Sequence, residues 1–222
     1  MKRSNVIRRF TTLAAFSLMA GCATKAGTGA VVGTAGGAVV GGVIGKVAGS
    51  TAKGAIIGAV VGGAAGAIIG RQMDKQAAEL GKNIPGAKVE RVGEGIQVTF
   101  DSGLLYDFDS DVVKQTAQTN LHELVVSLEK YPDSEVLIVG HTDNLGASAY
   151  NQALSERRSM GAARFLAAQG LDGARIGTRG MGETEPVANN ESDAGRAANR
   201  RVEVAIFASK ALRQRASNPG TK

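Results

Sequence analysis

The chain changes from strand to helix within the stretch Val139-Gly-His-Thr-Asp-Asn-Leu-Gly146, which continues through Tyr150-Asn-Gln-Ala-Leu-Ser-Glu-Arg-Arg158. The apolar run at 136–139 predicts a buried strand that ends at Gly140. A polar turn follows, and helical periodicity then extends from about Ala147 to Gln169. We therefore expect the polar residues of this stretch to gather where a strand ends and a helix begins.

This arrangement predicts a small binding site. Asp143 lies on the predicted loop after the strand, and three polar residues share one face of the next helix because they are spaced by four and three: Asn151, Ser155 and Arg158. A carboxylate can accept hydrogen bonds from an ammonium group, and a guanidinium can fork onto a carboxylate. The site therefore suits a small zwitterion, although Asp143 on these grounds alone could equally be a turn-forming or capping residue.

Three motifs stand out between about 104 and 207. They are Gly140-x-Thr142-Asp143-x-x-Gly146-x-x-x-x-Asn151-x-x-Leu154-Ser155-x-x-Arg158, Tyr106-Asp-Phe-Asp109 and Asn199-Arg-Arg-Val-Glu203. Together they resemble the OmpA-like peptidoglycan-binding domain. The resemblance implies that Asp143 and Arg158 hold the diaminopimelate side chain of the peptidoglycan stem peptide without a covalent bond. Asn151 is expected to support the site by fastening a loop.

Three further residues are candidates for the same peptidoglycan-binding site. Asp109 is expected either to cap the following helix or to lie on the rim. Arg200 and Arg201 border the predicted groove, but strand alternation sends them to opposite faces, so that at most one should reach it.

The first 21 residues have the layout of a secretory signal, with a basic start and an apolar core from Phe10 to Ala20. The signal closes on Leu18-Met-Ala-Gly-Cys22, which resembles a bacterial lipobox and implies lipidation of Cys22. The alternative is a plain signal peptide with a buried thiol. With Cys22 lipidated, 22–28 is predicted to be the lipidated N-terminal segment of the mature chain. Ala23, the residue after the cysteine, resembles that of lipoproteins released to the outer membrane.

Most of the net positive charge lies in the predicted signal segment. The formal charge is +6, but four of the basic residues lie in 1–21, and without this segment 22 basic and 20 acidic residues remain. The high isoelectric point is therefore weak evidence for a nucleic-acid partner, and none is expected. The single cysteine excludes an internal disulfide framework.

Glycine recurs every four residues in 29–49 and again in 54–70, with Val, Ile and Ala in between. Glycine costs about 0.8–1 kcal/mol relative to alanine inside a soluble helix, so such regularity needs a reason. In a bilayer a glycine stripe lets helices approach closely. We therefore expect 29–70 to form a membrane-associated glycine-zipper helical hairpin. A flexible linker and a hairpin that lies on the membrane without crossing it are the alternatives.

The rest of the chain predicts an α+β fold, with a small mixed β-sheet covered by helices, over 87–208. Alternation predicts a hairpin at 89–92 and 96–100, and further strands are expected at 136–139, about 174–181 and 201–207. Helices are expected at about 111–130 and 147–169, with a short one in 189–198. The segment 71–86 is expected to be a linker, and 209–222 a basic disordered tail that could touch an anionic surface.

No set of residues predicts catalysis. The two histidines, His122 and His141, have no second His or Cys nearby in the sequence, so no metal site is expected. His141 and Ser155 lack a recognisable third catalytic partner, and the glycine-rich run lacks a phosphate-loop ending, so no cofactor is expected.

The sequence therefore predicts a non-enzymatic lipoprotein of the outer membrane, lipid-anchored with its soluble domain in the periplasm. It would bind peptidoglycan and tether the membrane to the wall. The alternative is an oligomeric membrane protein whose glycine-zipper hairpins form a channel or an assembly scaffold.

Overall fold

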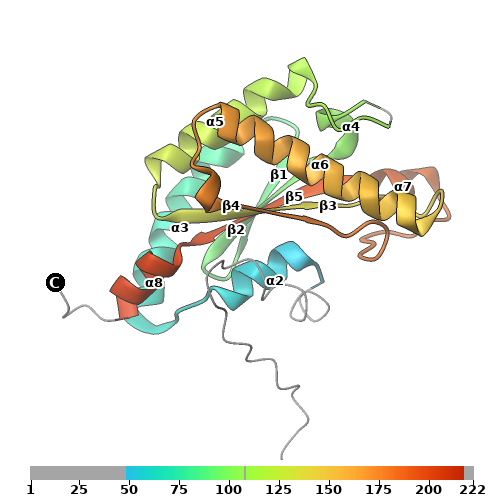
Figure 1. The fold of residues 1–222 in the computed structure, drawn as a ribbon. Helices are drawn as coiled ribbons and strands as arrows, with labels where there is room; N and C mark the ends of the chain where they lie inside the picture. The colour runs from blue at the N-terminus through green and yellow to red at the C-terminus, as the bar shows by residue number, and fades with distance from the viewer. Residues whose placement is uncertain (1–48, 108, 218–222) are drawn as a thin grey trace, which may run out of the picture. The chain divides into compact units, whose positions relative to one another are not determined.

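The computed structural model describes residues 49–107 and 109–217. Five strands form one sheet in the order β1-β2-β5-β3-β4 (Figure 1). Their bounds are β1 (Ala87–Val92), β2 (Gly95–Asp101), β3 (Ser134–Gly140), β4 (Ile176–Gly180) and β5 (Arg201–Ala208). The pairs β1–β2, β2–β5 and β5–β3 are antiparallel, and β3 pairs parallel with β4. The predicted α+β class with a mixed sheet is confirmed.

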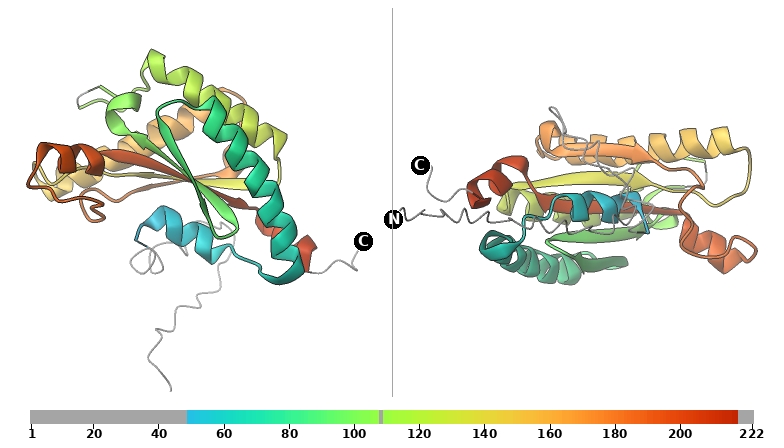
Figure 2. Two further views of the ribbon diagram at one scale, coloured as in Figure 1. Left: turned by 180° about the vertical axis from the view of Figure 1, so that it is seen from behind. Right: turned by 90° about the horizontal axis from the view of Figure 1, so that it is seen from below.

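Helices cover both faces of the sheet. Their bounds are α2 (Thr51–Gly58), α3 (Gly63–Asn83), α4 (Ser102–Leu105), α5 (Gln115–Lys130), α6 (Ser148–Ala168), α7 (Asp193–Asn199) and α8 (Lys210–Ser217), with the 3-10 turn η1 at Gly173–Arg175. Figure 2 shows α2 on the side of the sheet opposite α5 and α6. The helix α6 connects the parallel pair β3 and β4, as a parallel connection requires.

Alternate residues of the strands belong to two separate apolar clusters, one on each face of the sheet. On one face, Val136, Ile138 and Val204 pack with residues of α3, α5 and α6. On the other face, Leu137 and Val139 pack with Ile56 of α2. Because both faces are covered, β3 is apolar on both sides, as its sequence suggests.

The second glycine run does not form the single helix that was expected for 54–70. The helix α2 ends at Gly58, and Gly62 and Gly63 adopt positive φ angles of 75° and 61° before α3 continues. The carboxylate of Glu94 accepts hydrogen bonds from the backbone N–H groups of Val61 and Gly62, both at 2.8 Å. This break lets α2 turn onto the sheet.

No helix within the described ranges is long and apolar enough to span a membrane. The first glycine run, up to residue 48, and the predicted lipidation site Cys22 lie outside the described residues.

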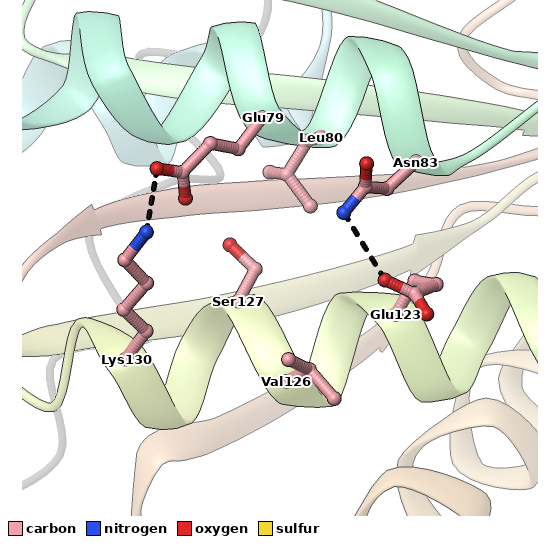
Figure 3. A pocket seen from close by; sticks show the side chains of 7 residues that line it. All are labelled: Glu79, Leu80, Asn83, Glu123, Val126, Ser127 and Lys130. Atoms are coloured by element: carbon pink, nitrogen blue, oxygen red, sulfur yellow. Dashed lines mark hydrogen bonds and ion pairs between the residues drawn. The ribbon is translucent and has the colours of Figure 1, made fainter.

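The segment 71–86 is not a linker. Residues 71–83 continue α3, and Met73, Gln76 and Leu80 are buried because they face the core between the sheet and α5. Figure 3 shows the groove between α3 and α5, where Lys130 pairs with Glu79 at 2.6 Å and Asn83 donates to Glu123 at 3.2 Å. The domain therefore begins well before residue 87.

The predicted disordered tail is also wrong over part of its length. Residues 210–217 form α8, and Leu212 and Ala216 pack against the main apolar cluster. Arg215 pairs with Asp133 at 2.6 Å. An apolar stripe of two residues spaced by four was enough to dock this basic segment as a helix.

Candidate functional site

A pocket of about 460 Å³ lies where β3, α6 and β5 meet. It is lined by Asp109, Thr142, Asp143, Leu145, Gly146, Tyr150, Asn151, Leu154, Arg158 and Arg200. The loop after β3 supplies the acid, α6 supplies one wall, and the residue before β5 closes the side. Figure 1 shows that the start of α6 and α7 lie at this same end of the sheet.

Asp143 is a fixed carboxylate on one side of the pocket. Its side chain is only 9% exposed. The Oδ1 atom accepts a hydrogen bond from the backbone N–H of Leu145 at 3.1 Å, and Oδ2 accepts one from Nη1 of Arg200 at 2.6 Å. The turn that follows β3 therefore sets the orientation of the acid, as expected of an Asp that bonds two residues onward.

Arg158 is a buried guanidinium that lines the same pocket. It is 6% exposed, and its Nε donates to the carbonyl of Ser110 at 3.0 Å while Nη2 donates to that of Asp107 at 3.4 Å. The guanidinium carbon lies 5.5 Å from the ring centre of Tyr106, a cation–π distance. Burial lowers the pKa of Arg158 below its usual value. The group nonetheless stays charged at neutral pH, as arginine does in proteins.

Asn151 fastens a loop at the edge of the pocket. Its Nδ2 donates to Oε2 of Glu183, in the segment after β4, at 2.6 Å. The supporting role of Asn151 at the site stays a prediction, and this bond shows which segment it would fasten. Ser155 also fastens that segment, because its Oγ accepts from the N–H of Gly182 at 2.8 Å.

Asp109 lies on the rim and does not cap the next helix. The helix α5 begins at Gln115, with Lys114 at its N-cap, so the cap interpretation fails. Asp109 has a φ of 54° and accepts a hydrogen bond from the hydroxyl of Tyr150. The rim alternative therefore describes its position.

Arg200 and Arg201 point in opposite directions. Arg200 lines the pocket, whereas Arg201 is buried on the other face, where its Nε donates to Glu203 at 2.8 Å and its Nη2 to the carbonyl of Glu185 at 3.1 Å. The inclusion of Arg201 among the site residues is thus wrong in this structure, because strand alternation turns its side chain away.

Sequence reasoning missed the apolar wall of the pocket. Tyr150 and Leu154 precede Arg158 by eight and four residues, so the three share one stripe of α6. That spacing could have identified them. Within residues 49–107 and 109–217, no group of three or more His, Cys, Asp or Glu side chains is placed to hold a metal ion.

These features define an α+β domain with a pocket of mixed charge at the carboxyl end of a central strand. Residues 105–200 match the model of the OmpA family, and residues 1–74 match that of the YMGG-like Gly-zipper. The chain therefore contains an OmpA-family domain preceded by a glycine-zipper segment, as the motifs predicted.

Relatives of known sequence share this domain. Outer membrane porin F of Pseudomonas fluorescens is 40% identical over 117 residues, which are 53% of this chain and 35% of that protein. The "Probable lipoprotein YiaD" of Escherichia coli K12 is 34% identical over 139 residues, or 62% of this chain and 64% of that protein. The chain thus covers less than two thirds of either relative.

Solved structures agree on the fold. The cell wall anchor of the T6SS from Pseudomonas aeruginosa superposes with a TM-score of 0.54 at 33% identity, covering 62% of this chain and 97% of that one. A MotB-like protein from Desulfovibrio vulgaris shares the fold with a TM-score of 0.59 at 23% identity, covering 64% of this chain and 93% of that one.

Proposed function

We propose that this chain is an outer-membrane lipoprotein that binds peptidoglycan non-covalently and tethers the membrane to the cell wall. The observation that carries the proposal is that an acid and a buried guanidinium, those of Asp143 and Arg158, line the same pocket. In this reading Asp143 accepts the ammonium and Arg158 takes the carboxylate of the diaminopimelate side chain.

The relatives support each half of this proposal. The structural neighbour described as a cell wall anchor supports attachment to peptidoglycan. The relatives described as an outer membrane porin and as a lipoprotein support the location in the outer membrane. Lipidation of Cys22 would supply the membrane anchor, and the role is structural, without catalysis.

Sedimentation with purified sacculi tests the wall-binding half. Asp143→Ala and Arg158→Ala should each abolish co-sedimentation while leaving the circular dichroism spectrum unchanged. Arg164→Ala is the matched control, because this exposed residue of the same helix pairs with Asp111 at 2.9 Å and does not line the pocket. Unchanged sedimentation of both pocket variants would overturn the site assignment.

The glycine-zipper match over residues 1–74 favours one competing function, an oligomeric channel or scaffold. Crosslinking of a Gly37→Leu variant separates the two functions, whereas leucine at Gly62 would strain the positive φ of the break between α2 and α3. A scaffold should fall to monomers in Gly37→Leu while wall binding persists, whereas a monomeric tether should show the same crosslinking pattern before and after substitution.

A further inference from the structure

The carboxylate of Asp143 already forms an ion pair with an arginine of the pocket, Arg200. Arg200 Nη1 donates to Oδ2 of Asp143 at 2.6 Å, which is typical of a charge-assisted hydrogen bond. The side chain of Arg200 is 43% exposed, while that of Asp143 is 9% exposed. The guanidinium of Arg200 therefore occupies, from the solvent side, one of the positions where a ligand ammonium would meet the carboxylate.

The two arginines of the pocket differ in how firmly they are held. Arg158 is buried and its hydrogen bonds go to the backbone carbonyls of Ser110 and Asp107. Arg200 belongs to the short connection between α7 and β5, and its side chain makes its polar contact with Asp143 alone among the described hydrogen bonds. Because Arg200 is half-exposed and bonded to Asp143, its side chain could leave the carboxylate without disturbing the core, whereas that of Arg158 could not.

We propose that Arg200 is an internal competitor for the ammonium position and thereby makes the pocket selective for zwitterionic ends over simple amines. A plain amine must displace Arg200 from Asp143 and leaves that guanidinium without an anion. A zwitterion brings a carboxylate that receives the displaced guanidinium alongside Arg158. This inference rests on the proposed function, because it names the chemical class that the same pocket prefers.

Charge balance supports this selectivity. Two acids, Asp143 and Asp109, and two guanidinium groups, those of Arg158 and Arg200, line the pocket, so its charges balance. A zwitterion leaves this balance unchanged, whereas a monocation adds an unmatched positive charge beside the two arginines. Such like-charge placement is a repulsive element that excludes the wrong ligand.

Two stem tripeptides that differ only at the third residue provide the test. Alanyl-glutamyl-diaminopimelate carries a zwitterion at its side-chain end, and alanyl-glutamyl-lysine carries an amine there. We would titrate each by calorimetry into the purified full chain in detergent, as wild type and as Arg200→Gln. The wild type should prefer the diaminopimelate peptide, and Arg200→Gln should reduce that preference by roughly tenfold, mainly by tighter binding of the lysine peptide.

Controls separate competition from a direct ligand contact. Arg164→Gln removes an equal charge from the same domain and should leave the preference unchanged. If Arg200 contacted the ligand directly instead, Arg200→Gln would weaken binding of the diaminopimelate peptide rather than tighten binding of the lysine peptide.

The inference fails if Arg200→Gln weakens both peptides equally or leaves the ratio unchanged while the wild type binds. The proposed function fails, and the inference with it, if the wild type binds neither peptide and does not sediment with sacculi. The two failures are therefore distinguishable.

Discussion

Arg158 and Arg201 show how one residue type is buried in two ways. Arg201 is 3% exposed and is neutralised by Glu203, whose Oε1 lies 2.8 Å away. Arg158 is also buried, but the carbonyls of Ser110 and Asp107 hold it. Carbonyl oxygens satisfy the donors without cancelling the charge. The positive charge of Arg158 thus stays available to an anion, whereas that of Arg201 stabilises the fold.

His141 predicts that acid weakens the fold. Its Nδ1 lies 3.9 Å from Glu185 and its Nε2 lies 3.8 Å from Glu203, with Arg201 packed beside them. Burial lowers the pKa of His141 below 6.5, despite the two acids. Because the pKa of His141 is lower in the folded than in the unfolded chain, the unfolded chain binds the proton more readily. The stability that depends on neutral His141 is therefore complete above about pH 6.5 and is lost as the pH falls below it.

Glu203 titrates in a different window. Burial alone would raise the pKa of Glu203, but His141 and Arg201 outweigh it and lower the pKa to about 2. The stability that ionised Glu203 contributes is fully present above about pH 4.5 and is lost only as the pH falls from there to about 2. Urea unfolding at about pH 7.5 and about pH 5.5 therefore isolates His141. His141→Asn should remove the difference in the free energy of unfolding between these two pH values. A variant that keeps the wild-type difference would contradict this origin.

Gly140 predicts a packing requirement beside the pocket. A Cβ at this position would lie 2.3 Å from the backbone oxygen of Ser155, so β3 and α6 could not approach as they do. We expect Gly140→Ala to destabilise the fold by about 1–3 kcal/mol, the usual cost of overpacking. Gly173→Ala is the matched control, because its Cβ would meet nothing within 4 Å. Equal denaturation midpoints for the two variants would contradict the prediction.

At the scale of elements, α2 is the least expected feature. It covers the second face of the sheet, and its first turn is tied down by Glu185, which accepts from the N–H of Thr51 at 3.0 Å and from its hydroxyl at 2.7 Å. Gly95 lets Ile56 approach closely, because a Cβ there would lie 2.5 Å from that side chain. The second glycine run therefore contributes to the core of the domain.

The docking of α2 predicts a contrast between two neighbouring residues. Ile56 is fully buried against the sheet, whereas Ile57 is 44% exposed. Ile56→Ala should destabilise the fold by about 2–5 kcal/mol, and Ile57→Ala by less than about 0.5 kcal/mol. Chemical denaturation of both variants measures the difference. Similar small losses would mean that α2 is not part of the cooperative fold.

Sequence alone predicted the elements whose patterns are local. Alternation located β1 and β2, and helical spacing located α6 with Asn151 and Arg158 on one face. The same reasoning failed for α2 and α3, because glycines spaced by four suit both a partner helix in a bilayer and a close approach to the chain's own sheet. It also missed the ion pair of Asp143 with Arg200, since 57 residues separate the two.

At the scale of the whole molecule, the proposed tether has two attachments of different kinds. Acyl chains on Cys22, outside the described residues, would hold it in the membrane, while the pocket would bind the wall reversibly. Cys22→Ala should move the protein out of the outer-membrane fraction, and Arg158→Ala should abolish sedimentation with sacculi without changing the fractionation. Distant sites act independently, so the double variant should lose both properties.

Anchoring should also strengthen wall binding without any new contact. A membrane anchor confines the domain to the layer beside the wall, which raises its effective concentration at each stem peptide. Cys22→Ala should therefore lower wall occupancy in cells, even though the purified variant keeps the wild-type Kd for the diaminopimelate tripeptide. Crosslinking to peptidoglycan in intact cells measures the first quantity and calorimetry the second. Equal occupancy of the wild type and Cys22→Ala would mean that the pocket alone retains the protein at the wall.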